Sequence, residues 1–338
     1  MLSRVFKSAA RVFKSSDQRA REAAEMLGLR VDPGSPFTQM DQAFFDEGMA
    51  RLQCGGIRAL EELYVRKYIT KRRHISGRRA YAILEGVAGN LVSSELPSAT
   101  AERLAEDFRE QWREAGRGPF ASAMLAQILF NTGYTYRGTG WANSVSKDAW
   151  RMFGSYCEQA HDVLLESSSG ASQCPYWHRV LVSIGLSDGA DPDELARRFQ
   201  RAQAYDPLDL DIYWTRSYQL LPRWHGSHEE HEKFALQSVA DTKQELGMSI
   251  YARIYANISD DEDVPETGAD WALMKRGFED WVARVDSQRV YNVYANLAHQ
   301  FGDQEALKSL FSGRITEYHS DGWHSAEQAA SVMEEQRK

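Results

Sequence analysis

The chain has 338 residues, a formal net charge of −8, 26% charged residues and 43% hydrophobic residues. This composition excludes a small disulfide scaffold, a collagen-like chain and a disordered chain, and the length suits one large domain or two smaller ones. The sequence contains no apolar run of about 18 residues, so it predicts no transmembrane helix.

The three cysteines, Cys54, Cys157 and Cys174, are odd in number and include no C-x-x-C spacing. That pattern is typical of reduced thiols in a cytoplasmic protein. We therefore expect them to act as small apolar side chains rather than as nucleophiles.

Positive charge is concentrated at the N-terminal end. Residues 1–80 carry 16 Lys and Arg against 9 Asp and Glu, whereas the rest carries 24 against 39. The string RVFKS occurs at 4–8 and again at 11–15, which places apolar residues on one helix face and basic residues on the other. Residues 1–30 are therefore predicted to be a basic amphipathic helical segment. Either residues 2–15 contact an anionic membrane or an acidic protein, or this helix packs on the body; the acidic net charge disfavours nucleic acid.

Residues 31–133 are predicted to be a helical N-terminal region. A loop containing Pro33, Gly34 and Pro36 precedes a helix that starts at Thr38 and ends at Gly55 and Gly56. The alternating pattern of a β-strand is almost absent from the whole chain. Further helices are expected at 57–70, 77–94, 98–115 (capped by Ser98 or Thr100) and 119–132.

A dense basic cluster follows the second of these helices, and no acid occurs between 66 and 79. One interpretation is a surface for an anionic partner. The other is a solvated helix end, where cations meet the negative end of the helix dipole. The cluster consists of Arg66, Lys67, Lys71, Arg72, Arg73, Arg78 and Arg79.

Residues 134–146 are rich in glycine, serine and aromatic residues and are predicted to form an ordered loop. Tyr136, Arg137 and Trp141 could together bind a small anion or a peptide, since a guanidinium group suits carboxylate and phosphate. Alternatively, Arg137 caps a helix or pairs with an acid to hold the loop.

Helical repeats are predicted in the second half, residues 134–338. Leu195, Phe199, Ala202 and Pro207 have the spacing of the second helix of a tetratricopeptide-type repeat. A similar helix pair is expected at 287–320, and a charged helix at 324–337 is expected to cap the stack.

The most distinctive string is YQLLPRWHGSHEEHEKFA at 218–235. Pro222 and Gly226 interrupt the helices, Ser227 and Glu230 form a capping box, and Trp224 is expected to be a buried wedge in the turn. The string also contains His225, His228 and His231. Their spacing allows a metal site, although a polar helix face is the alternative.

This string resembles the turn signature of a bacterial family of helical, tetratricopeptide-like proteins catalogued as a domain of unknown function. The resemblance covers roughly residues 134–240, and His225 stands where the family pattern favours glycine. It implies a helical-repeat fold and no known activity. The upstream part of the match consists of Tyr136, Arg137, Gly138, Gly140, Ala142 and Val145.

The sequence therefore predicts an all-α protein: a superhelical stack of antiparallel helix pairs with a helical N-terminal region. We expect a non-enzymatic, cytoplasmic module that binds a peptide or protein on a concave helical surface, with no catalytic residue and no cofactor. The alternatives are an enzyme or metal-binding protein, using the Arg137 loop or the three histidines, and an adaptor at the inner membrane face. The candidate binding residues are Tyr136, Arg137, Trp141, Trp224 and His225.

Overall fold

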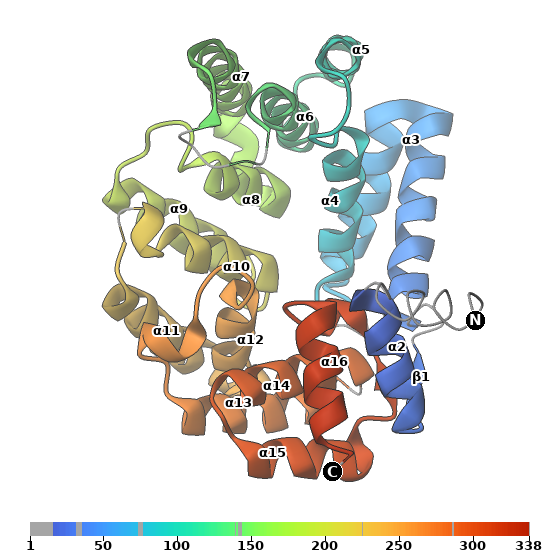
Figure 1. The fold of residues 1–338 in the computed structure, drawn as a ribbon. Helices are drawn as coiled ribbons and strands as arrows, with labels where there is room; N and C mark the ends of the chain where they lie inside the picture. Colours follow the sequence, from blue (N-terminus) through green and yellow to red (C-terminus); the bar gives the residue numbers. More distant parts are fainter. Residues whose placement is uncertain are drawn as a thin grey trace, which may run out of the picture. The chain divides into compact units, whose positions relative to one another are not determined.

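The computed structural model describes residues 16–31, 36–73, 77–138, 140, 144–224, 226–285 and 287–337. These residues form fifteen α-helices, α2 to α16, and two strands of two residues each (Figure 1). The predicted all-α class is confirmed. The chain divides into two compact units, of which unit 1 contains Met1–Ser35 and Gly226–Lys338 and unit 2 contains Pro36–His225.

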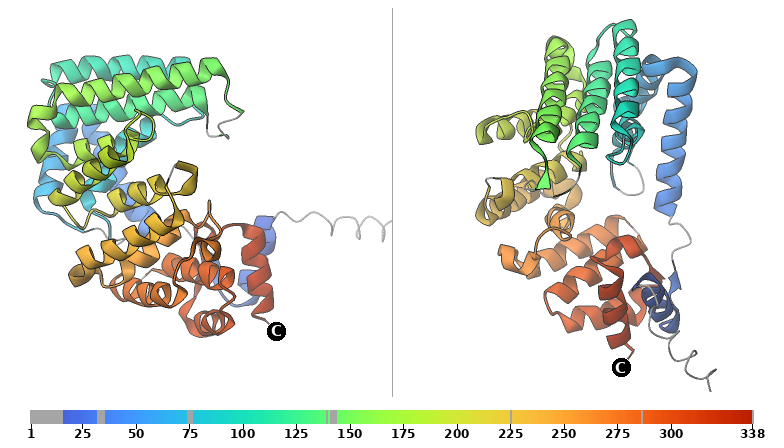
Figure 2. Two further views of the ribbon diagram at one scale, coloured as in Figure 1. Left: turned by 90° about the vertical axis from the view of Figure 1, so that its left-hand side faces the viewer. Right: turned by 45° about the horizontal axis from the view of Figure 1, so that its top comes forward.

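Unit 2 is built around α6. This helix packs against α4, α5, α7 and α8, and Figure 2 shows α5, α6 and α7 lying side by side. Most of its side chains are buried because it is apolar on nearly every face. The helices of unit 2 are α3 (Pro36–Ile69), α4 (Ala80–Leu91), α5 (Ser98–Glu114), α6 (Pro119–Arg137), α7 (Lys147–Glu166), α8 (Pro175–Ile184), α9 (Pro192–Tyr205) and α10 (Leu210–Gln219), with 3₁₀ turns at Ser168–Gln173 and Pro222–Trp224.

Helix α3 is a hairpin of two arms. Gly55 and Gly56 have non-helical backbone angles, and the φ of Gly56 is 62°, a value that favours glycine. Lys67 on the second arm lies 3.4 Å from Glu47 on the first. Twenty residues of straight helix would span roughly 30 Å, so the chain must reverse between them. The predicted break at the two glycines is confirmed.

Unit 1 contains the other helices. They are α2 (Ser16–Met26), α11 (His228–Leu246), α12 (Ser249–Ile258), α13 (Trp271–Arg284), α14 (Gln288–Gln300), α15 (Gln304–Ser309) and α16 (Ala326–Glu335). A π-helical turn at Leu310–Arg314 and 3₁₀ turns at Val264–Thr267 and Ser320–Gly322 connect some of these helices.

Unit 1 joins the two ends of the chain. Helix α2 packs against α16 (Figure 1), with Ala20, Ala23 and Ala24 fully buried. Strand β1 (Arg30–Val31) pairs in parallel with β2 (Glu317–Tyr318). This division differs from the predicted boundaries near residues 30 and 133, because the segments that meet are almost the whole chain apart.

The local predictions have mixed outcomes. The capping box is present, since Ser227 Oγ accepts a hydrogen bond of 3.1 Å from the Glu230 amide. The predicted cap of α5 is wrong: Pro97 is its N-cap residue, and Ser98 Oγ donates instead to the Thr135 carbonyl at 3.3 Å. Helices α8 and α9 pack together, as do α14 and α15, where repeat pairs are predicted. A tetratricopeptide-type arrangement stays a prediction.

A charge placed under α2 is expected to unfold unit 1 locally. In Ala24→Asp a carboxylate replaces a fully buried methyl group. The free energy that holds α2 against α16 should therefore decrease by several kcal/mol. Hydrogen exchange measured by mass spectrometry should show loss of protection in α16 with α6 unchanged. Glu25→Asp, on the exposed side of α2, is the control. Equal loss of protection in α6 would contradict the two-unit division.

Candidate functional site

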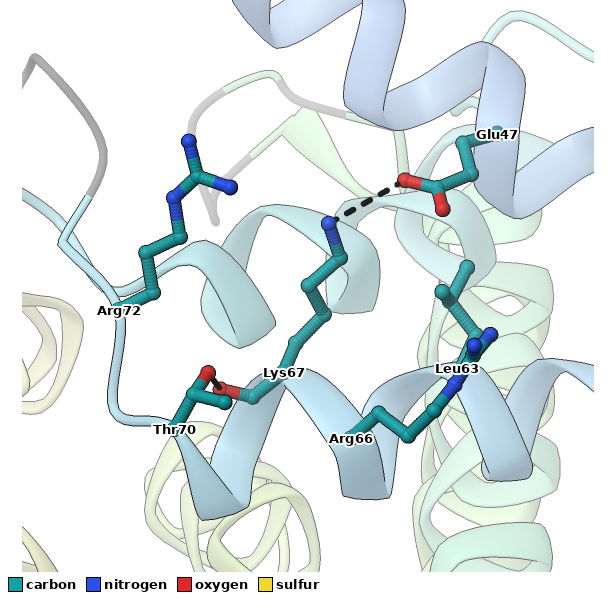
Figure 3. Close-up of a pocket in the computed structure, with 6 residues that line it drawn as sticks. All are labelled: Glu47, Leu63, Arg66, Lys67, Thr70 and Arg72. Carbon is teal, nitrogen blue, oxygen red and sulfur yellow. Dashed lines mark hydrogen bonds and ion pairs between the residues drawn. The ribbon is translucent and has the colours of Figure 1, made fainter.

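A pocket of about 300 Å³ opens between the two arms of the α3 hairpin (Figure 3). Glu47 comes from the first arm, Leu63, Arg66 and Lys67 come from the second arm, and Thr70 and Arg72 follow the helix end. Three cations and one acid line the pocket, so its lining has a net charge of +2. The lining residues are Glu47, Leu63, Arg66, Lys67, Thr70 and Arg72.

Lys67 is held inside the pocket. Its ammonium group lies 3.4 Å from the Glu47 carboxylate and 4.5 Å from the centroid of the Phe44 ring. The Lys67 side chain is 20% exposed, and Figure 3 shows its ammonium group between Glu47 and the Arg72 guanidinium. Lys67 and Glu47 therefore compensate each other's charge.

Arg66 and Arg72 are exposed. Within the described part of the chain, neither guanidinium group has an acidic partner at ion-pair distance. Thr70 Oγ1 donates 2.9 Å to the Lys67 carbonyl, which leaves its oxygen able to accept a hydrogen bond. The pocket therefore has two guanidinium groups that are available to an external anion.

The turn that carries Arg72 is anchored on both sides. Lys71 adopts a φ of 43°, which is strained for a residue with a Cβ, and its ammonium group donates 3.3 Å to the Tyr205 carbonyl. Arg79 donates 2.7 Å to the Lys71 carbonyl, and the Ala80 amide donates 2.9 Å to the Arg72 carbonyl. These bonds fix the backbone from which Arg72 extends.

Arg79 does not belong to the basic surface that was predicted. It is 7% exposed, and it donates to both carboxylate oxygens of Asp206 at 2.6 and 2.8 Å. Burial opposes ionisation of Asp206, but the hydrogen bonds and charge of Arg79 outweigh it and lower the pKa of that carboxyl. Arg78 likewise donates to both oxygens of Asp211, at 3.0 and 2.6 Å. Of the seven predicted cations, these two pair with carboxylates of unit 2, and Lys71 bonds to the Tyr205 carbonyl.

A third buried arginine extends this network. Arg179 on α8 lies 2.6 Å from Glu85 and 2.9 Å from Asp211, and it donates to Asp209 as well. Burial raises the pKa of Glu85, although Arg179 opposes that shift. Sequence reasoning missed this cluster, because its members come from α4, α8, α10 and the α9–α10 connection.

The structure separates the residues of the predicted 134–146 site. Arg137 ends α6 and donates 2.9 and 3.1 Å to the carbonyls of Gly138 and Gly140, so it holds its own loop as the alternative interpretation predicted. Tyr136 points instead to α5, where its hydroxyl donates 2.5 Å to Glu102. That bond raises the pKa of Tyr136 to about 12. Trp141 lies outside the described residues.

The three histidines that were predicted as a possible metal site also form no such site among the described residues. His231 is 1% exposed and its ring meets Tyr255 edge-on at 5.0 Å, whereas His228 lies 3.6 Å from Glu262. Within the described residues, no three His, Cys, Asp or Glu side chains are grouped so that they could hold a metal ion. His225 lies outside those residues. Trp224 is half-buried in its 3₁₀ turn rather than buried, so the predicted wedge is only partly correct.

Two of the three thiols are buried, and Cys54 is exposed. Burial raises the pKa of Cys157 and of Cys174 to about 12, so both remain protonated at neutral pH. A protonated thiol is a poor nucleophile, and this agrees with their predicted role as small apolar side chains.

The chain matches no protein-family model, no curated protein and no solved structure. The resemblance of residues 134–240 to a tetratricopeptide-like family therefore stays a prediction. Among the described helices, none combines the length and apolarity needed to cross a bilayer. Residues 2–15, predicted to contact an anionic surface, lie outside the described part.

Two neighbouring arginines should differ sharply when replaced. Arg79→Met leaves the buried Asp206 carboxylate without its partner, so we expect a loss of about 3–5 kcal/mol in the unfolding free energy of unit 2. Arg72→Met, at an exposed site, should change it by less than about 0.5 kcal/mol. Hydrogen exchange of the α6 amides measures the unfolding free energy of unit 2 in both variants. Similar losses in the two variants would contradict the assignment of Arg79 to the fold.

Acid should destabilise unit 1 through His231. Burial, aided by nearby His228, lowers the pKa of His231 from 6.5 to about 4. Between pH 6.5 and pH 4 the unfolded chain therefore binds a proton at His231 and the folded chain does not. The unfolding free energy of unit 1 decreases over that range as the pH falls. The loss should reach about 3 kcal/mol and be absent in His231→Phe. Hydrogen exchange of α12 amides at pH 7 and pH 4.5 tests this, and equal losses in both proteins would contradict it.

Proposed function

We propose that this protein is a non-enzymatic protein–protein interaction module and that unit 2 binds an acidic peptide segment of a partner at the α3 pocket. The observation that carries this proposal is the pair of exposed arginines, Arg66 and Arg72, that face the pocket without an acidic partner among the described residues. Arg78 and Arg79, which are close by in sequence, pair with carboxylates of the same unit.

The contrast between paired and unpaired arginines supports the proposal. Arg78, Arg79 and Arg179 each pair with carboxylates of the same unit. Arg66 and Arg72 line a pocket that is open to solvent, and Figure 3 shows Lys67 lying between them. A guanidinium group in that position is well suited to a carboxylate or another oxyanion, because its planar fork matches two acceptor oxygens.

The architecture also supports a binding role. Consecutive helices of unit 2 pack against each other, including α3 with α4, α5 with α6, and α8 with α9. Stacked helix pairs of this kind present rigid surfaces on which side chains from several helices face one partner. Arg137, on which one form of the enzyme alternative rests, donates to two carbonyls of its own loop.

Charge removal at the pocket tests the proposed function. Arg66→Gln/Arg72→Gln should abolish capture of a protein partner by the full chain, since both uncompensated charges are lost. The matched control, Arg113→Gln/Arg151→Gln, removes two exposed charges from α5 and α7 and should leave capture intact. Affinity capture from the native host, quantified by mass spectrometry, measures both. A partner that binds all three proteins equally would refute the proposed surface.

A further inference from the structure

The α3 pocket favours an anion that carries more than one negative charge. Among the described lining residues, Arg66, Lys67 and Arg72 accompany one acid, Glu47. Because Lys67 and Glu47 already form an ion pair, the two guanidinium groups have no acidic partner within the described part of the chain. A side-chain carboxylate would neutralise one of them, whereas a phosphomonoester carries about −1.5 to −2 charges at pH 7 and would neutralise both.

The other lining residues suit the same group. A phosphomonoester offers three strong acceptor oxygens, and guanidinium forks bind two such oxygens at once. Leu63 is the one apolar residue among the described residues that line the pocket. The pocket, at about 300 Å³, has room for the phosphoryl group and for the carbon stem of the side chain that carries it.

The dipole of α3 does not account for Arg72. Cations near the C-terminal end of a helix are favourable without any ligand, and this explains Arg66 and Lys67. The effect falls off within the last turn, whereas Arg72 lies beyond Ile69, on the turn held by Arg79 and Lys71. Unit 2 thus fixes the backbone of an exposed cation that has no acidic partner among the described residues of the unit.

We propose that the α3 pocket binds a phosphorylated side chain in a peptide segment of a protein partner. This inference rests on the proposed function, because it names the chemical group that the interaction module recognises. Arg72 and Arg66 bind the phosphoryl oxygens. Lys67 is shared between the ligand and Glu47.

Three short peptides that differ at one position test the ligand class. Blocked Gly-Gly-X-Gly-Gly peptides with phosphoserine, serine or glutamate at X are titrated into the full chain by calorimetry at low salt. The phosphoserine peptide should bind at least tenfold more tightly than either of the others. Equal binding of the glutamate peptide would overturn the inference, and so would inorganic phosphate that binds as tightly as the phosphopeptide.

The variants are chosen so that misfolding cannot imitate the result. Arg72→Gln and Arg66→Gln/Arg72→Gln should each weaken binding of the phosphoserine peptide at least tenfold, with Arg113→Gln/Arg151→Gln unchanged. Glu47→Gln should strengthen it by about threefold or more, since it frees Lys67 and raises the lining charge; local unfolding would weaken it instead. Unchanged affinity in Arg72→Gln or in Glu47→Gln would overturn the inference.

Two further measurements separate this inference from the proposed function. If phosphatase treatment of the host extract leaves partner capture intact while Arg66→Gln/Arg72→Gln abolishes it, the phosphoryl inference fails and the interaction module stands. If that variant captures the partner normally, the proposed surface itself fails. Vesicles containing phosphatidylinositol 4-phosphate form the last arm, and arginine-dependent binding to them without phosphopeptide binding would also overturn the inference.

Discussion

The buried ion pair between Arg79 and Asp206 is the interaction on which the candidate site of unit 2 depends. Arg79 immediately precedes α4 and Asp206 immediately follows α9, so the pair joins two connections that are 127 positions apart. Asp206 also accepts hydrogen bonds from Tyr81 and from the Leu208 amide. A buried pair adds little net stability once its desolvation is counted, but its full set of hydrogen bonds fixes geometry. The pair also fixes the backbone next to Arg72, because Arg79 donates a hydrogen bond to the Lys71 carbonyl.

The network around this pair also explains how so much charge can lie inside a helical unit. Three arginines meet four carboxylates there, those of Glu85, Asp206, Asp209 and Asp211. Burial raises the pKa of Glu85, and Arg179 opposes that shift. The three arginines of the network therefore meet their acidic partners within unit 2, whereas the three cations and one acid that line the pocket leave an excess of positive charge there.

The sequence predicted the helices well because their signals are local. The period of apolar residues, the Gly55–Gly56 break and the Ser227–Glu230 cap all act within a few residues. The sequence could not show which cations of the basic cluster are paired and which are exposed. Arg78 and Arg79 differ from Arg72 only in their partners, Asp211 and Asp206, which lie more than a hundred residues later in the chain. For the same reason the sequence missed the packing of α2 on α16. The pocket could not be predicted without the fold, because Glu47 and Lys67 come together only when the two arms of α3 run in opposite directions.

The packing of α2 also decides how the membrane alternative must be tested. Charge pattern alone suggests comparing the full chain with a truncated one that begins near Asp32. Such a truncation removes α2 and β1, and with them the buried surface of Ala20, Ala23 and Ala24 and the pairing of β1 with β2. The exposed face of α16 could then bind vesicles through its apolar side chains, or the truncated protein could aggregate. Either effect would obscure the contribution of the basic segment. A deletion that ends before Ser16, the first described residue of α2, removes the basic residues of the N-terminal end and keeps α2 and β1 in the chain.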